Sequence, residues 1–199
     1  MSYAIIGFGN IGRALANAFA RKGLEVSVAT TRDPASFAAD AAAIGPTIIP
    51  KTLAEAVKAD IIFLAVRFES HPAVAKALPD WQGKTVVDAM NTQAPLAEFS
   101  GLPSSALVAK VFSGSRLVKG FNHLVAAVLR QDPAVHGGRR VVFLASDDDG
   151  AAEEVGALAE KLGFAPIQLG GLSEGGLLVH ARGKSWGHLI FKDLVKFDR

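Results

Sequence analysis

The 199-residue sequence contains no cysteine. This absence excludes a thiol nucleophile, a zinc–thiolate site and a disulfide framework. The sequence also has little excess charge, because 21 basic residues stand against 19 acidic ones and give a formal net charge of +2. The basic residues are scattered and do not alternate with aromatic side chains, so we expect no nucleic-acid partner.

Long hydrophobic runs are missing as well. The uninterrupted apolar runs are too short to span a bilayer, so we expect no membrane partner. A signal peptide has no room before the first strand-like run, which begins at Tyr3. Half of the residues are hydrophobic and a fifth are charged, which favours a substantial core. We therefore expect a soluble, cytoplasmic protein.

Motifs of metal-dependent or hydrolytic enzymes are also absent. The sequence holds no HExxH and no GxSxG, and no pair of carboxylates stands out. The acidic run Asp147–Asp149 precedes a helical pattern, and we interpret it as a helix cap rather than a metal site. We expect no bound metal.

What the sequence does contain is a regular alternation of short apolar runs and amphipathic segments. The runs typical of strands are Tyr3–Gly7, Glu25–Thr30, Asp60–Val66, Thr85–Ala89, Leu117–Phe121, Arg140–Ala145 and Pro166–Leu169, with a weaker one at Thr47–Ile49. Most are unbroken, as in strands covered by helices on both faces. Ile11–Arg21 and Ala151–Leu162 each place apolar side chains on one helical stripe. The alternation predicts an α/β fold with an open, doubly wound, mostly parallel sheet of the Rossmann type.

The first strand runs into a glycine-rich turn, GFGNIG, with Gly7, Gly9 and Gly12. In a strand–turn–helix context, the first glycine allows a tight exit from the strand and the third allows the helix to pack closely. Gly9 has no Cβ, so a pyrophosphate can approach the backbone and the amides at the helix start. A ligand-free tight turn would use the same glycines, but the surrounding pattern favours a dinucleotide site.

The sequence has no acidic residue at the end of the second strand, where NAD-binding proteins use one to hydrogen-bond the ribose. The second strand ends in VSVATTRDP, which places Ala29, Thr30, Thr31 and Arg32 at that position. Two hydroxyls and a guanidinium suit the 2′-phosphate of NADP, which a carboxylate would repel. Asp33 precedes Pro34 and is interpreted as a helix cap. The alternative is that Arg32 is a solvated surface charge. NADP(H) is the predicted cofactor.

Polar side chains follow other strands at the edge where ligands bind. Asn91 and Asn122 can hydrogen-bond a nicotinamide or a substrate, or can simply stabilise their own turns. No catalytic residue can be identified from the sequence. His123 is a weak candidate for a proton donor facing the crevice, although a histidine without a role is as plausible there. Near the C-terminus, His180 and Arg182 can reach an anionic substrate, or can cap a helix.

Several motifs together resemble one family, the deazaflavin (coenzyme F-420)-dependent NADP reductases and their predicted dinucleotide-binding relatives. The segments that carry the resemblance are GFGNIG, GLEVSVATTR, ADIIFLAVRFES, VVDAMN, LVKGFNHL and FLASDDDGAAEEVGALAEKLGFAPIQLGGL. The same fold forms the cytoplasmic reductase domain of the transmembrane metalloreductases. The resemblance covers nearly the whole chain.

The resemblance implies a set of cofactor-binding residues. Gly7, Phe8, Gly9, Asn10, Ile11 and Gly12 would bind the pyrophosphate, Thr30, Thr31 and Arg32 the 2′-phosphate, and Ala65, Val66, Arg67, Asn91 and Asn122 the nicotinamide side. Two segments depart from the family. Arg67 stands where relatives commonly have proline, and VHARGKSWGHLIF lacks the usual acidic, proline-interrupted pattern. Both lie on the substrate side and weaken the case for a deazaflavin acceptor.

The sequence therefore predicts an NADP(H)-dependent oxidoreductase that moves hydride between the nicotinamide and a flat acceptor, namely a deazaflavin, flavin, quinone or metal chelate. The alternative is an NADPH-binding sensor without turnover. Pyrroline-carboxylate reductases and hydroxyacid dehydrogenases rank lower, because strand–helix–strand alternation persists through Leu169 where they need a helical domain. We expect residues 1–170 to form the NAD(P)-binding domain, and 171–199 a helical extension of the same compact unit. Apolar residues at Leu189–Phe197, near Trp186, favour a homodimer.

Overall fold

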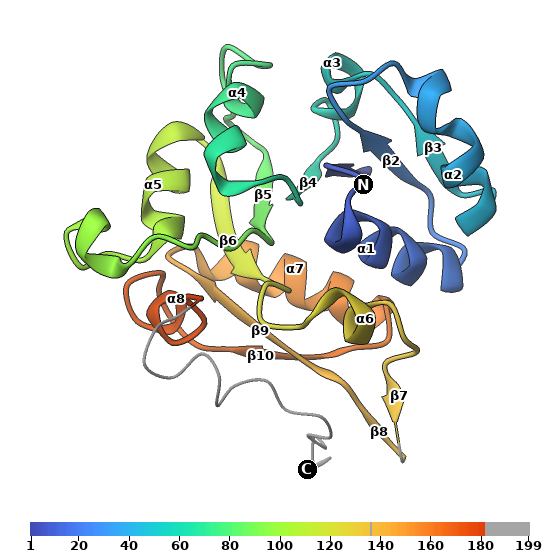
Figure 1. The fold of residues 1–199 in the computed structure, drawn as a ribbon. Coiled ribbons are helices and arrows are strands. Elements are labelled where there is room, and N and C mark those ends of the chain that lie inside the picture. The colour runs from blue at the N-terminus through green and yellow to red at the C-terminus, as the bar shows by residue number, and fades with distance from the viewer. Residues whose placement is uncertain (136, 182–199) are drawn as a thin grey trace.

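A single eight-stranded sheet forms the centre of the computed structural model, which describes residues 1–135 and 137–181. Its strands lie in the order β10-β9-β6-β5-β4-β1-β2-β3 (Figure 1). Their bounds are β1 Tyr3–Ile6, β2 Val26–Ala29, β3 Ile48–Pro50, β4 Ile61–Leu64, β5 Thr85–Asp88, β6 Arg116–Gly120, β9 Val141–Ser146 and β10 Ala165–Gln168. The doubly wound, mostly parallel sheet predicted from the sequence is confirmed.

Helices cover both faces of this sheet. They are α1 Asn10–Arg21, α2 Ala38–Ile44, α3 Leu53–Ala56, α4 His71–Ala75, α5 Ser104–Val111, α6 Ala126–Leu129, α7 Asp149–Lys161 and α8 Gly175–Leu178, with 3-10 turns η1 Pro34–Phe37, η2 Phe68–Ser70 and η3 Leu96–Phe99. In β1, Ile5 points into a core shared with α1, α6 and α7, whereas Ala4 and Ile6 point into a core shared with α3, α4 and α5. This alternation explains why the strands are unbroken apolar runs.

The predicted caps are confirmed. Asp33 Oδ1 accepts the Ala35 N–H at 2.8 Å before η1, and Asp148 Oδ1 accepts the Ala151 N–H at 2.8 Å before α7. The helix that Asp33 is expected to cap is a 3-10 turn followed by the seven-residue α2.

The regular alternation expected through Leu169 breaks between β6 and β9. Among its described residues, this connection holds just the four-residue α6 and a hairpin of β7 (Ala134–Val135) and β8 (Gly138–Arg139). It does not return the chain to the amino end of the sheet, so β9 pairs antiparallel to β6, with Gly120 opposite Leu144. β10 then pairs parallel to β9, across α7. The last two strands therefore run against the other six.

The described part of the C-terminal segment contains the short α8, which packs against β9. Val179, just after α8, lies in a buried cluster with Val141, Phe143 and Ala165. The predicted helix at Leu189–Phe197 and the candidate Arg182 lie outside the described residues. Within the described ranges, no helix is long and apolar enough to span a bilayer.

Candidate functional site

A cleft of about 850 Å³ lies at the carboxyl ends of β1, β2 and β4. Open α/β sheets bind ligands at this carboxyl edge of the strands. The residues that line the cleft are Ile6, Gly7, Phe8, Gly9, Thr30, Thr31, Arg32, Leu53, Ala65, Val66, Arg67, Glu69, Ser70, Ala73 and Val74. The structure thus brings together most of the predicted cofactor-binding residues on one concave surface.

Two glycines of GFGNIG are required by the fold itself. Gly7 has φ +103°, and its N–H donates to the Ala29 carbonyl at 2.8 Å. A Cβ on Gly7 would lie 2.4 Å from the Ala65 carbonyl oxygen, and one on Gly12 would lie 1.9 Å from the Gly7 carbonyl oxygen. Both positions therefore exclude larger side chains by backbone contact alone.

Gly9 differs, because a Cβ built on it would meet no atom within 4 Å. It is the N-cap of α1, which has no side-chain cap and no acidic residue in its first turn. The first backbone amides of α1 therefore have no capping side chain and no nearby carboxylate of the first turn. These amides and the positive end of the helix dipole can bind an anion at the glycine turn. The packing of the protein does not require glycine at this position. A pyrophosphate bound against the backbone would require it, because a Cβ would block its approach. The turn fits a dinucleotide.

The exit of β2 forms a second polar wall. The Arg32 backbone N–H donates to Thr30 Oγ1 at 3.0 Å, which closes a small turn at the strand end. The Arg32 guanidinium carbon lies 5.7 Å from the centre of the Phe37 ring. Because Asp33 is turned toward Ala35, no carboxylate of this segment opposes an anion at Thr30–Arg32. Hydroxyls and a guanidinium on this wall fit a phosphate.

Sequence reasoning missed Arg13, which supports the glycine turn from α1. Its guanidinium carbon lies 4.7 Å from the centre of the Phe8 ring, and Nε donates to the Phe8 carbonyl at 3.2 Å. Phe8 in turn packs on Phe37 at 5.7 Å between ring centres. An ion pair with Asp40 holds the guanidinium in place. No local motif signals this role, because Asp40, which holds the guanidinium, lies 27 positions further along the chain.

The exit of β4 provides the opposite side of the cleft. Ala65 donates its N–H to the Ile6 carbonyl at 2.8 Å, so Ala65 and Val66 lie beside the glycine turn. Arg67 is exposed and makes no ion pair with any of the described residues. Glu69 lines the same cleft, and the sequence analysis did not select it.

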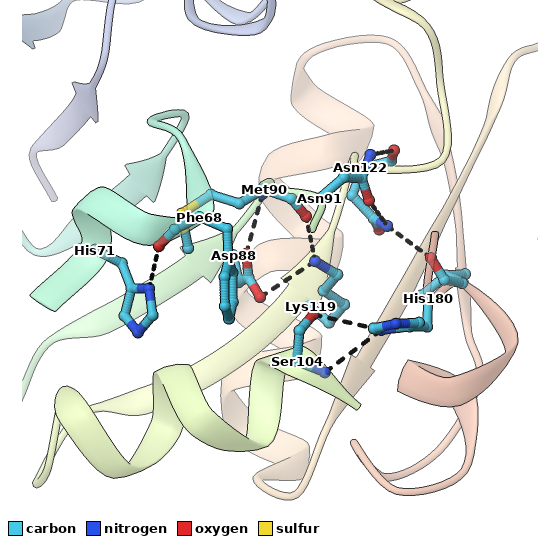
Figure 2. A network of polar contacts seen from close by, with 10 residues as sticks. Phe68, His71, Asp88, Met90, Asn91, Ser104, Lys119, Asn122 and His180 are labelled. Atoms are coloured by element: carbon cyan, nitrogen blue, oxygen red, sulfur yellow. Dashed lines mark hydrogen bonds and ion pairs between the residues drawn. The ribbon is translucent and has the colours of Figure 1, made fainter. Parts of the chain in front are cut away.

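Asn91 and Asn122 lie together beyond the ends of β5 and β6 (Figure 2). Neither residue lines the cleft. Asn91 Nδ2 donates to the Asn122 carbonyl at 2.8 Å, and Asn122 Nδ2 donates to Asn91 Oδ1 at 2.9 Å. Asn122 Nδ2 also donates to the Val179 carbonyl at 2.7 Å. Asn122 is buried, whereas Asn91 is exposed.

An ion pair between Asp88 and Lys119 lies beneath these asparagines, and the sequence analysis missed it. Lys119 Nζ lies 3.2 Å from Asp88 Oδ2, and both side chains are almost fully buried. The two residues face each other in the register of β5 and β6. The available signal was one charge of opposite sign inside each of two apolar runs, VVDAM and LVKGF. Burial lowers the pKa of Lys119, and the Asp88 carboxylate opposes that effect.

His123 is buried and does not line the cleft, contrary to the expectation that it faces the crevice. Its ring centre lies 4.8 Å from that of Phe143. Burial lowers the pKa of His123 from 6.5 to about 4, against a smaller opposing effect of a hydrogen bond with the Val141 backbone. The imidazole is therefore neutral near pH 7. Within the described ranges, no three His, Cys, Asp or Glu residues are grouped to hold a metal.

Comparison with known proteins finds a family model described as coenzyme F420-dependent NADP oxidoreductase, which matches residues 2–92. A solved structure of a hypothetical protein from Sinorhizobium meliloti is 35% identical, with a TM-score of 0.90, and the match covers 99% of this chain and 96% of that one. A protein from Arthrobacter sp. FB24 described as an F420-dependent NADP reductase is 26% identical, covers 86% of each chain and gives a TM-score of 0.68.

Curated relatives are longer than this chain. Human metalloreductase STEAP2 is 29% identical over 177 residues, which is 87% of this chain and 34% of the relative. Rat metalloreductase STEAP3 is 28% identical over 171 residues, or 85% and 34% of the two chains. The chain thus spans about a third of the length of the curated relatives it matches.

Proposed function

Since the chain belongs to the family of coenzyme F420-dependent NADP oxidoreductases, we propose that it binds NADP(H) in the cleft and transfers hydride between the nicotinamide and a second redox compound. The observation that carries this proposal is the exit of β2. Thr30, Thr31 and Arg32 line the cleft there, while the nearest acid, Asp33, caps η1 instead. An NAD-specific site would place a carboxylate at this position.

Each wall of the cleft has a separate role in this proposal. Gly9 and the first amides of α1 hold the pyrophosphate, and Thr30–Arg32 hold the 2′-phosphate. Arg67 adds a second cation to the cleft, against the single acid Glu69, so the lining favours an anionic ligand. Ala65, Val66 and the Asn91–Asn122 pair lie on the nicotinamide side. When bound, the nicotinamide supplies the hydride chemistry.

The proposed acceptor is a flat redox compound: a deazaflavin, flavin or quinone that takes the hydride, or a metal chelate, of which two equivalents take one electron each while one proton is released. The family model names coenzyme F420, and the curated relatives are named metalloreductases, which supports this range. The chain does not need to supply a proton donor to such an acceptor, because a flavin-like ring takes up hydride without a dedicated side-chain acid. A neutral, buried His123 is consistent with that chemistry.

A second candidate function is an NADPH sensor without turnover, and Arg67 favours it. This exposed guanidinium lines the cleft at the exit of β4, where it can occupy space that an acceptor would need. We also propose a homodimer, on the strength of the apolar sequence at Leu189–Phe197. Sedimentation at micromolar concentration tests it, and a pure monomer contradicts it.

The test of turnover is the loss of NADPH absorbance when the protein is offered each acceptor class in turn. A reductase oxidises NADPH with at least one deazaflavin, flavin, quinone or ferric chelate. Tight NADPH binding without oxidation by any of them favours the sensor. Failure to bind NADPH refutes both candidates. Arg67→Ala provides a matched variant, since a sensor whose acceptor side is blocked by Arg67 should gain turnover when that side chain is removed.

A further inference from the structure

The buried ion pair at the carboxyl ends of β5 and β6 holds the backbone of a single residue, Met90, between its two charges. Asp88 Oδ1 accepts the Met90 N–H at 3.0 Å. Lys119 Nζ donates to the Met90 carbonyl at 2.5 Å and lies 3.2 Å from Asp88 Oδ2 (Figure 2). The backbone of Met90 is therefore fixed on both its donor and its acceptor side by charged groups from two neighbouring strands.

Stability alone does not account for this arrangement. Removing a lysine and an aspartate from water is costly, and well-packed apolar residues of similar size often serve a core as well or better. Val87 and Val118, one position earlier in each strand, are apolar, buried and paired with each other in the register. The charged pair occurs instead at the carboxyl ends of the strands, the edge of the sheet at which the cleft also lies, although neither residue lines the cleft. A role that depends on the position of the Met90 backbone explains this placement.

The fixed backbone of Met90 leads directly to the exposed Asn91. The side chain of Asn91 is held by two hydrogen bonds to Asn122, one to its carbonyl and one from its amide. Asn122 is tied in turn to the Val179 carbonyl. Each polar atom of the Asn91 amide retains one further hydrogen-bonding position, because Nδ2 carries two hydrogens and Oδ1 has two lone pairs. Asn91 thus presents a fixed, complementary amide to the edge that binds ligands.

We propose that Lys119 is a positioning residue for the nicotinamide half of the nucleotide, and that it acts by fixing the Met90–Asn91 turn on which the nicotinamide carboxamide docks. This inference rests on the proposed function and deepens it. A primary carboxamide pairs with another amide through one donor and one acceptor, which is the pair that Asn91 offers. Lys119 itself is buried beneath the turn and does not touch the ligand.

The test separates the two halves of the nucleotide by calorimetry with NADP⁺ and with 2′,5′-ADP, which lacks the nicotinamide. Lys119→Met should weaken NADP⁺ binding by roughly tenfold, because the Met90–Asn91 turn loses the hydrogen bond from Lys119 to the Met90 carbonyl. The affinity of this variant for 2′,5′-ADP should stay within about twofold of that of the unmutated protein, since the proposed site for the 2′-phosphate lies at β2. Lys84→Met is the matched control. Lys84 Nζ bonds the Lys58 and Ala59 carbonyls, away from the cleft, so neither ligand should be affected.

A double variant keeps the test valid if the unpaired Asp88 carboxylate destabilises Lys119→Met. In Asp88→Asn/Lys119→Met both charges are absent, so thermal stability should recover while the selective loss of NADP⁺ affinity persists. Recovery of NADP⁺ affinity together with stability would overturn the inference and leave the pair with a structural role. So would an equal loss of affinity for both ligands. Failure of the unmutated protein to bind 2′,5′-ADP would instead refute the proposed function, and this inference with it.

Discussion

A Cβ atom placed on Gly12 would lie 1.9 Å from the carbonyl oxygen of Gly7. The start of α1 therefore packs directly on the turn that leaves β1, and the two glycines depend on each other. Gly9, between them, has open space where its side chain would be. The three glycines of one motif thus separate into two that the fold requires and one that a ligand would require.

This separation predicts opposite outcomes for two alanine substitutions. Gly12→Ala should lower the free energy of unfolding by roughly 1–3 kcal/mol or more, because a methyl group is forced against backbone. Gly9→Ala should change it by less than about 1 kcal/mol, yet weaken NADPH binding by at least about tenfold, because its methyl group occupies the path of the pyrophosphate. Urea unfolding and NADPH titration of both variants check this. Unchanged NADPH affinity in a folded Gly9→Ala protein would argue against the turn as the pyrophosphate site.

Arg67 is predicted to act on NADPH and NADH alike. It lines the cleft at the exit of β4, away from the β2 wall that would read the 2′-phosphate. Arg67→Ala should weaken the binding of both nucleotides by about tenfold or more, because one charge-assisted hydrogen bond is lost. Glu69→Gln removes the negative charge from the same cleft and should strengthen the binding of both nucleotides. Fluorescence titration with each nucleotide measures these changes, and an effect of Arg67→Ala on NADPH alone would place it at the 2′-phosphate instead.

His123 predicts a pH dependence of stability. Its pKa is about 4 in the folded protein, because of burial, against 6.5 when exposed. Above pH 6.5 the imidazole is neutral in both states, so its contribution is constant. Between pH 6.5 and 4 only the unfolded chain binds the proton, so the free energy of unfolding falls by up to about 3 kcal/mol. Below pH 4 both states are protonated and this effect ends.

In the variant His123→Gln, the free energy of unfolding should fall less between pH 6.5 and 4 when unfolding is followed in urea at several pH values. Part of the pH dependence should remain. Burial also lowers the pKa of His180, as does the neighbouring Lys119 ammonium to a smaller extent, and this acts in the same direction. Identical slopes for the variant and the unmutated protein would show that His123 does not carry the effect.

Much of the fold could be predicted from the sequence because its strongest signals are local. The positions of the strands along the chain up to β6, the glycine turn and the caps at Asp33 and Asp148 depend on residues within a few positions of one another. The antiparallel entry of β9 depends instead on the connection through α6, β7 and β8, which does not return the chain to the amino end of the sheet. Helices as short as α6 are held by packing, here through Leu129, rather than by their own propensity.

The candidate site divides in the same way. Thr30–Arg32 are adjacent in sequence, so their shared wall was predictable. The contacts of Lys119 with Asp88, and of Arg13 with Phe8 and Asp40, join segments whose register only the folded sheet and its helices define. The pairing of Asn91 with Asn122 is of the same kind, since the sequence could place each asparagine at a strand end but could not bring them together.

The most direct test of the account is the ratio of the dissociation constants for NADH and NADPH, measured by calorimetry on the unmutated protein and on Arg32→Ala. The unmutated protein should prefer NADPH by at least about tenfold, since a charge-assisted contact with the 2′-phosphate contributes about 1.5 kcal/mol or more. Arg32→Ala should remove most of that preference, while Arg67→Ala should leave it in place. Equal affinity of the unmutated protein for NADH and NADPH would contradict the assignment of this cleft to NADP(H).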